Sequence, residues 1–146
     1  MERGSCVECL HFSPTDSRKL VSTGNTYTAK QWNVDTGERI GVVEGSKFAL
    51  FSPDGRTIAT AGGLGKREVL FFDAETGASR LRLLSHAQNV SSAAWSVGGS
   101  MLATGSRYDG IYKVWDVSTG ALLIKTKIRS SIESVSCGRD WVLDTQ

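Results

Sequence analysis

The chain has 146 residues, with 17 basic and 15 acidic side chains and a formal net charge of +2 at neutral pH. This balance creates no strong field toward nucleic acid or a membrane surface, so neither is an expected partner. No apolar run approaches the roughly 18 residues of a membrane-spanning helix, and no signal peptide is recognised near Met1. We therefore expect a cytoplasmic or nuclear protein.

Short apolar segments alternate with turn residues along the chain, a pattern typical of short antiparallel strands. Turn-forming residues follow the first segment of each group, as in Ser13-Pro14 and Ser52-Pro53-Asp54-Gly55. No helix is expected. The expected strands form three groups of four and a final pair: 10–12, 20–23, 30–32 and 39–43; 50–51, 58–61, 70–72 and 80–84; 94–95, 102–105, 113–115 and 122–128; then 132–137 and 141–145.

One six-residue phrase closes the third expected strand of each group. It runs from Trp32 to Gly37, from Phe72 to Gly77 and from Trp115 to Gly120, at intervals of 40 and 43 residues, and each copy ends in Thr-Gly. Repetition at such a period indicates that the repeat is the unit of folding. We therefore predict an all-β chain in which each repeat forms one four-stranded antiparallel sheet.

The third repeat carries the motifs of a known family. Ser85-His86 stands near its start, Asp109-Gly110 lies between its second and third strands, and Trp115-Asp116 closes it. In these positions the chain resembles the WD40-repeat β-propellers, whose repeats carry Gly-His near the start and Trp-Asp near the end. The resemblance implies a propeller of four-stranded antiparallel blades. It also implies a structural hydrogen-bond network within the third blade, made by His86, Thr104, Asp109 and Trp115.

The first two repeats depart from this pattern. Thr26 and Lys66 occupy the positions expected for the aspartate, and Arg3 and Val42 occupy those expected for the histidine. We therefore expect the first two blades to be held by apolar packing alone.

The chain is too short for a closed ring, because propellers typically have four to eight blades. The expected blades are approximately 5–45, 46–85 and 86–129, with a partial blade at 130–146 that makes about three and a half in total. Three explanations stay open: a fragment of a longer protein, closure by another subunit, or an open assembly. We favour a fragment, with the remaining blades supplied by a longer chain or another subunit.

Catalytic and cofactor motifs are weak. No carboxylate pair or activated nucleophile is recognised, and the family pattern gives His86 a structural role, so we predict no catalytic residue. Cys6 and Cys9 form a C-x-x-C, but positions three apart on a strand point to opposite faces, so neither a metal site nor a redox pair is expected. The glycine-rich segment 62–67 lacks the Gly and Ser or Thr of a P-loop. No cofactor is expected.

The family resemblance implies a partner surface made by two sets of loops: those joining blades and those joining second and third strands. Lys66 and Arg67 in the second repeat favour a partner with an acidic segment. The expected function is a non-catalytic protein–protein interaction scaffold; the alternatives are a non-catalytic appendage of a larger enzyme and a nucleic-acid or phosphopeptide reader. The expected partner face comprises Tyr27, Lys47, Lys66, Arg67, Gln88, Asn89, Arg107 and Tyr108.

Overall fold

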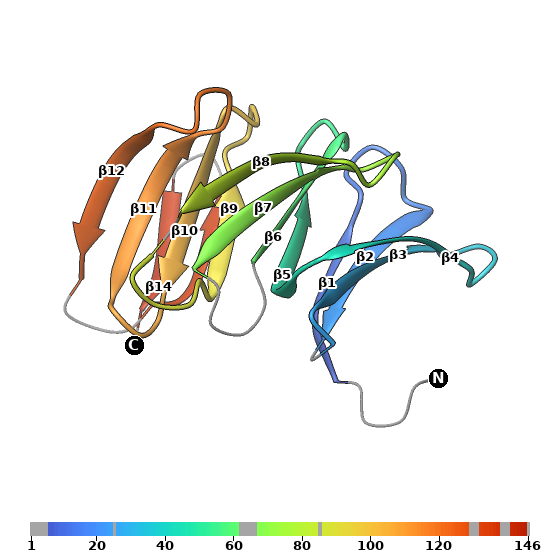
Figure 1. The fold of residues 1–146 in the computed structure, drawn as a ribbon, viewed down its shortest axis with the longest axis horizontal. Helices are drawn as coiled ribbons and strands as arrows, with labels where there is room; N and C mark the ends of the chain where they lie inside the picture. The colour runs from blue at the N-terminus through green and yellow to red at the C-terminus, as the bar shows by residue number, and fades with distance from the viewer. Residues whose placement is uncertain are drawn as a thin grey trace.

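A computed structural model describes residues 6–24, 26–61, 67–84, 86–128, 132–137 and 141–145. Within these ranges every regular element is a β-strand (Figure 1). The first sheet contains β1 (Val7–Phe12), β2 (Lys19–Gly24), β3 (Thr28–Asn33) and β4 (Arg39–Glu44). The second contains β5 (Ser46–Phe51), β6 (Thr57–Ala61), β7 (Glu68–Asp73) and β8 (Ser79–Leu84). The third contains β9 (Ser92–Trp95), β10 (Met101–Ser106), β11 (Ile111–Asp116) and β12 (Leu122–Lys127). A two-stranded sheet follows, made of β13 (Ile132–Cys137) and β14 (Trp141–Thr145).

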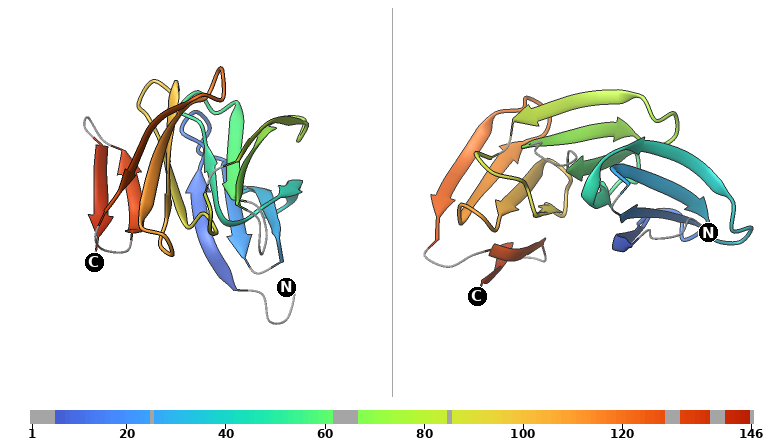
Figure 2. Two further views of the ribbon diagram at one scale, coloured as in Figure 1. Left: turned by 60° about the vertical axis from the view of Figure 1, so that its left-hand side comes forward. Right: turned by 60° about the horizontal axis from the view of Figure 1, so that its bottom comes forward.

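Each sheet is an antiparallel meander in which strands pair in sequence order. The sheets follow one another along an open arc, with β13 and β14 at its C-terminal end (Figures 1 and 2). The first strands contact one another from sheet to sheet, because β1 packs on β5, β5 on β9 and β9 on β13. The first strands therefore form the inner side of the arc, and the predicted all-β propeller segment with an unclosed ring is confirmed.

The repeated phrase builds the turn between the third and fourth strands of each sheet. Its acid or amide side chain accepts hydrogen bonds from the backbone N–H groups two and three residues later, and its Thr hydroxyl accepts one from the residue after the glycine. The glycine has a φ of +73° to +75° in the three copies, which favours glycine over other residues. The phrase recurs because each of these residues satisfies or permits the same turn.

Apolar side chains fill the space between consecutive sheets. Between the second and third sheets, the rings of Phe71 and Trp95 meet edge to face with centroids 5.7 Å apart. Because side chains alternate along a strand, each sheet presents one apolar face to each neighbour. The layer between the first and second sheets includes Val21, Ala29, Val43, Phe51, Ile58, Leu70 and Phe72. The layer between the second and third includes Phe48, Ala59, Val69, Phe71, Trp95, Leu102 and Trp115.

Candidate functional site

Two sets of loops meet at one end of the sheets. In each sheet, a backbone N–H in the segment that leaves the fourth strand donates to a carbonyl in the loop between the second and third strands. This link ties the two loop types together in every repeat, so both lie on the same side of the arc. The donor and acceptor pairs are Gly45 to Tyr27 at 3.1 Å, His86 to Arg67 at 3.2 Å, and Ile128 to Gly110 at 2.9 Å.

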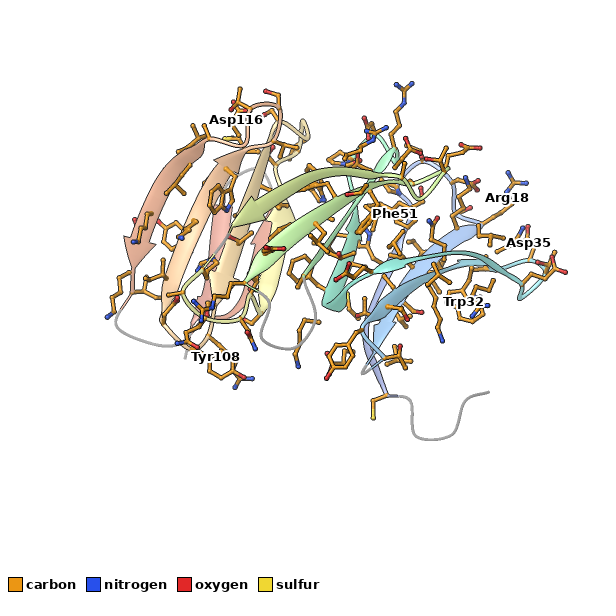
Figure 3. All side chains as sticks on the ribbon, in the orientation of Figure 1. Arg18, Trp32, Asp35, Phe51, Tyr108 and Asp116 are labelled. Atoms are coloured by element: carbon orange, nitrogen blue, oxygen red, sulfur yellow. The ribbon has the colours of Figure 1, made fainter. Side chains whose placement is uncertain are left out.

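Most of the residues expected on the partner face are accessible at this end. Tyr108 is 67% exposed and Tyr27 is 47% exposed. Figure 3 places Tyr108 at the opposite end of the third sheet from Asp116. Arg67, Gln88 and Arg107 are also exposed, whereas Asn89 is half-buried, and Lys66 lies outside the described residues. We call these accessible loops the partner face.

Two residues of the partner face have unusual backbone conformations. Tyr27 and Lys47 have φ angles of 59° and 67°, and they are the two non-glycine residues with positive φ in the described ranges. Such conformations cost on the order of 1 kcal/mol each and persist only where the surrounding structure imposes them. The Lys47 ammonium also pairs with the Glu8 carboxylate at 3.5 Å, so its charge is partly compensated within the chain. Arg67 and Arg107 are further exposed cations of these loops.

A buried hydrogen-bond chain crosses the third sheet. Trp115 Nε1 donates to Thr104 Oγ1 at 3.0 Å, and the same oxygen lies 3.0 Å from His86 Nε2. Because the indole can only donate, the Thr104 hydroxyl accepts from Trp115, and it also shares a hydrogen bond with His86 Nε2. The other ring nitrogen of His86, Nδ1, faces the Asp109 carboxylate.

Asp109 lies outside this series of side-chain hydrogen bonds. Its Oδ2 lies 3.8 Å from His86 Nδ1, too far for a hydrogen bond, and neither atom has a hydrogen-bond partner in the described part of the chain. The other carboxylate oxygen accepts the backbone N–H of Ile111 at 2.9 Å. The structure thus brings the four expected residues together, but hydrogen bonds join three of them.

Burial keeps His86 neutral. Its side chain is inaccessible to solvent, and this desolvation lowers its pKa to about 4, against the opposing effect of the Asp109 carboxylate. This neutral imidazole shares a hydrogen bond with threonine and has no accessible surface from which to reach a substrate.

The low pKa of His86 predicts an acid-sensitive fold. Between about pH 6.5 and pH 4, His86 binds a proton in the unfolded chain but not in the folded chain. The contribution of His86 to the free energy of unfolding therefore falls across this range and is constant below it. The expected loss from this group is about 3 kcal/mol at most. Urea unfolding of the wild type and of His86→Gln between pH 7.5 and 4 checks this. An equal pH dependence in both proteins would contradict it.

The first sheet keeps part of the network, contrary to the expectation of packing alone. Trp32 Nε1 donates to Ser22 Oγ at 2.8 Å, the same bond that Trp115 makes to Thr104. Ser22 and Thr104 are equivalent, because each lies two residues after the strand partner of its tryptophan. The expectation was wrong because it followed the aspartate and histidine positions and did not consider a tryptophan–hydroxyl pair without them.

The second sheet replaces the network with a backbone bond. Thr60 Oγ1 donates to the carbonyl of Glu44 at 2.8 Å. The residue equivalent to His86 is Gly45, because both donate their N–H to the loop between the second and third strands of the preceding sheet. The assignment of Val42 to this position was therefore wrong: Val42 lies within β4 and is exposed.

His11 joins the first and second sheets, a role that the sequence did not reveal. Its Nδ1 accepts the backbone N–H of Phe51 at 3.1 Å, and the two rings stack with centroids 6.1 Å apart. Burial lowers the pKa of His11, which favours the neutral ring that this bond requires. The only signal in the sequence was a histidine between two apolar residues of a first strand.

The described residues offer no group of three His, Cys, Asp or Glu side chains placed to hold a metal ion. Cys6 and Cys9 carry free thiols, and the Cys9 thiol contacts the Ala49 carbonyl at 3.9 Å. The glycine-rich segment lies outside the described ranges from Gly62 to Lys66. Among the described residues, there is no helix that could span a membrane.

The sheets, their inner first strands and the loop links define a segment of a β-propeller. Residues 78–116 match the WD40 family model, described as WD domain, G-beta repeat. The chain therefore contains a repeat of the WD40 family within a WD40-type propeller fold. Proteins of this family are generally interaction scaffolds and not enzymes.

Two solved structures share this fold. The structure of U3-55K superposes with a TM-score of 0.81 at 18% identity, covering 94% of this chain and 44% of that one. The crystal structure of the RRP9 WD40 repeats superposes with a TM-score of 0.81 at 19% identity, covering 94% of this chain and 43% of that one. The present chain thus spans less than half the length of either structure, and at these identities the likeness establishes the fold alone.

Proposed function

We propose that this chain is a non-catalytic protein-interaction module that binds an acidic segment of another protein through its partner face. The supporting observation is the repeated loop link, which holds exposed Tyr and Arg side chains of different sheets on one side of a rigid arc. Loops on a rigid scaffold are common binding elements. Tyr and Arg are also the residue types that most often dominate interface energies.

Charge favours an acidic partner. Arg67 and Arg107 are exposed at the partner face, and Lys66 precedes Arg67 in the sequence. Glu8 neutralises Lys47 in part, and Arg67 and Arg107 add positive charge beside the second and third sheets. A carboxylate-bearing segment would complement these cations and would pair with the guanidinium groups in bidentate geometry.

Photo-cross-linking tests the position of the partner face. A p-benzoylphenylalanine at position 108 is expected to give protein adducts in cells that express the chain. The matched control carries the same group at position 119, an exposed residue of the turn at the other end of the third sheet. Equal adducts from both positions would contradict the proposed face, and adducts with RNA would favour the nucleic-acid alternative.

Charge reversal tests the acidic partner. With the cross-linked protein purified, Arg67→Glu is expected to weaken its binding about ten-fold, because an attractive charge pair becomes repulsive. Arg18→Glu is the matched control, since Arg18 is an exposed cation in the β1–β2 turn at the opposite end of its sheet. Unchanged affinity for Arg67→Glu, measured by calorimetry at low salt, would remove the acidic segment from the proposal.

A further inference from the structure

A groove lies at the opposite end of the sheets from the partner face. It has a volume of about 360 Å³ and runs across three sheets, where their first strands end and turn toward the second strands. We call it the turn-side groove. Its lining includes His11, Pro14, Phe51, Pro53, Trp95 and Val97. Because these residues belong to three successive sheets on the inner side of the arc, the groove is a product of the propeller arrangement.

The chemistry of the groove is apolar and uncharged. Lysine, arginine, aspartate and glutamate are absent from its described lining. Val97 at its rim is 71% exposed. A charged ligand would lose hydration here without gaining an ion pair, whereas an uncharged apolar ligand would cover exposed hydrocarbon.

One hydrogen-bond donor of the groove lining has no acceptor among the described residues. His11 Nδ1 accepts the Phe51 N–H at 3.1 Å, so the neutral ring carries its proton on Nε2. His11 is half-buried, and no described residue accepts a hydrogen bond from Nε2. The stacked Phe51 ring and the Nδ1 bond fix the imidazole, so this donor is held in place before any ligand arrives.

We propose that the turn-side groove binds an extended, uncharged apolar peptide segment, whose backbone carbonyl accepts a hydrogen bond from His11 Nε2. Aliphatic or proline side chains of the segment would pack against Pro14, Pro53 and Val97. The volume lies at the lower end of the range for ligand pockets, about 300 to 1,000 Å³, and suits a few residues of a peptide. An extended peptide presents carbonyl groups beside apolar side chains. The carbonyl groups complement the His11 donor, and the side chains complement the apolar lining of the groove.

Titration of the 146-residue chain with acetyl-Pro-Val-Leu-Val-Pro-amide, followed by methyl and amide NMR, tests this inference. We expect shifts at Ala93, Ala94 and Val97 and no shifts at Tyr108. The analogue with Asp in place of Leu should bind at least about ten-fold more weakly, because a carboxylate loses hydration in an uncharged groove. No shifts in the groove at millimolar peptide, or equal affinity for both peptides, would overturn the proposal.

Two substitutions and a matched control locate the site. Val97→Lys should weaken peptide binding roughly ten-fold by placing a charge at the rim. Val34→Lys, the same change at a 42% exposed valine outside the groove, should leave binding unchanged. His11→Phe should weaken binding about five-fold through the lost hydrogen bond, and near-UV circular dichroism verifies that each variant is folded. Equal losses from the Val34 and Val97 variants would overturn the assignment.

Other occupants give distinct results. Groove shifts with sodium decanoate but none with the peptide would make the groove an aliphatic-chain site and would overturn the peptide proposal. Arg67→Glu should leave affinity for the apolar peptide unchanged, since Arg67 lies on the partner face. The turn-side groove and the partner face can therefore succeed or fail independently.

Discussion

Thr104→Val is expected to lower the free energy of unfolding by about 3 kcal/mol, although valine has nearly the shape of threonine. Thr104 is fully buried, and its hydroxyl accepts from Trp115 Nε1 and shares a hydrogen bond with His86 Nε2. Valine removes the hydroxyl partner of both buried nitrogen atoms. Each orphaned polar group costs about 1 to 3 kcal/mol, which is more than the net value of the bonds themselves. Urea unfolding at pH 7.5 measures the loss.

Two companion variants separate the hydroxyl from the packing. Thr104→Ser keeps the hydroxyl and removes a methyl group, so it is expected to cost only about 1 kcal/mol. Ser22→Ala in the first sheet removes the acceptor of a single, partly buried indole bond and should cost about 1 kcal/mol as well. A Thr104→Val loss no larger than that of Ser22→Ala would show that the two-bond chain in the third sheet adds nothing.

The repeats and strands could be predicted from the sequence because their causes are local. In the phrase that ends at Gly37, the asparagine caps the turn, the threonine accepts a backbone N–H and the glycine permits the positive φ. All three functions act within six residues, so the pattern survives in every copy. The third repeat could be recognised for the same reason, because its His, Thr, Asp and Trp stand at the spacing of the family.

The contacts between sheets could not be predicted at this level. The connection from β4 to β5 is a single residue, Gly45, whereas β8 and β9 are separated by a longer segment. The assignment of Val42 therefore missed Gly45, which precedes Phe72 by 27 residues, whereas His86 precedes Trp115 by 29. The Ser22 bond was missed similarly, since the hydroxyl precedes its tryptophan by 10 residues in the first repeat and by 11 in the third. The Phe51 bond of His11 depends on a strand 40 residues away.

These contacts change the interpretation of the weaker repeats. The hydroxyl position is retained in all three sheets by Ser22, Thr60 and Thr104, and its partner differs each time: an indole, a backbone carbonyl, or an indole and an imidazole. The hydroxyl is therefore the common element of the blades, and the aspartate and histidine are additions in the third. In the second sheet Gly45 stands at the position of the imidazole and has no side chain, and its backbone lies close to the side chain of Thr60.

Gly45→Ala is expected to destabilise the protein by about 4 kcal/mol for two separate reasons. The φ of Gly45 is 152°, a region that other residues rarely adopt, and a Cβ there would lie 2.4 Å from Thr60 Cβ and 2.5 Å from Thr60 Oγ1. Backbone strain of this kind costs about 1 to 3 kcal/mol, and overpacking a closed contact adds a similar amount. The Thr60 bond to Glu44 would also be displaced, because the clash involves the donating oxygen.

Gly37→Ala is the matched control, since Gly37 also has a positive φ, +73°, but a Cβ there would meet no atom within 4 Å. It should cost only about 1 kcal/mol, the backbone share alone. Thr60→Gly should then be less harmful in the Gly45→Ala background than in the wild type, because it removes all three atoms that the new Cβ would meet. That coupling, on the order of 1 kcal/mol or more in thermal or urea unfolding, would identify contact with Thr60 as the cause. Equal losses from the two alanine variants would mean that backbone conformation alone accounts for the loss in Gly45→Ala. Close packing of Gly45 against Thr60 would then contribute nothing.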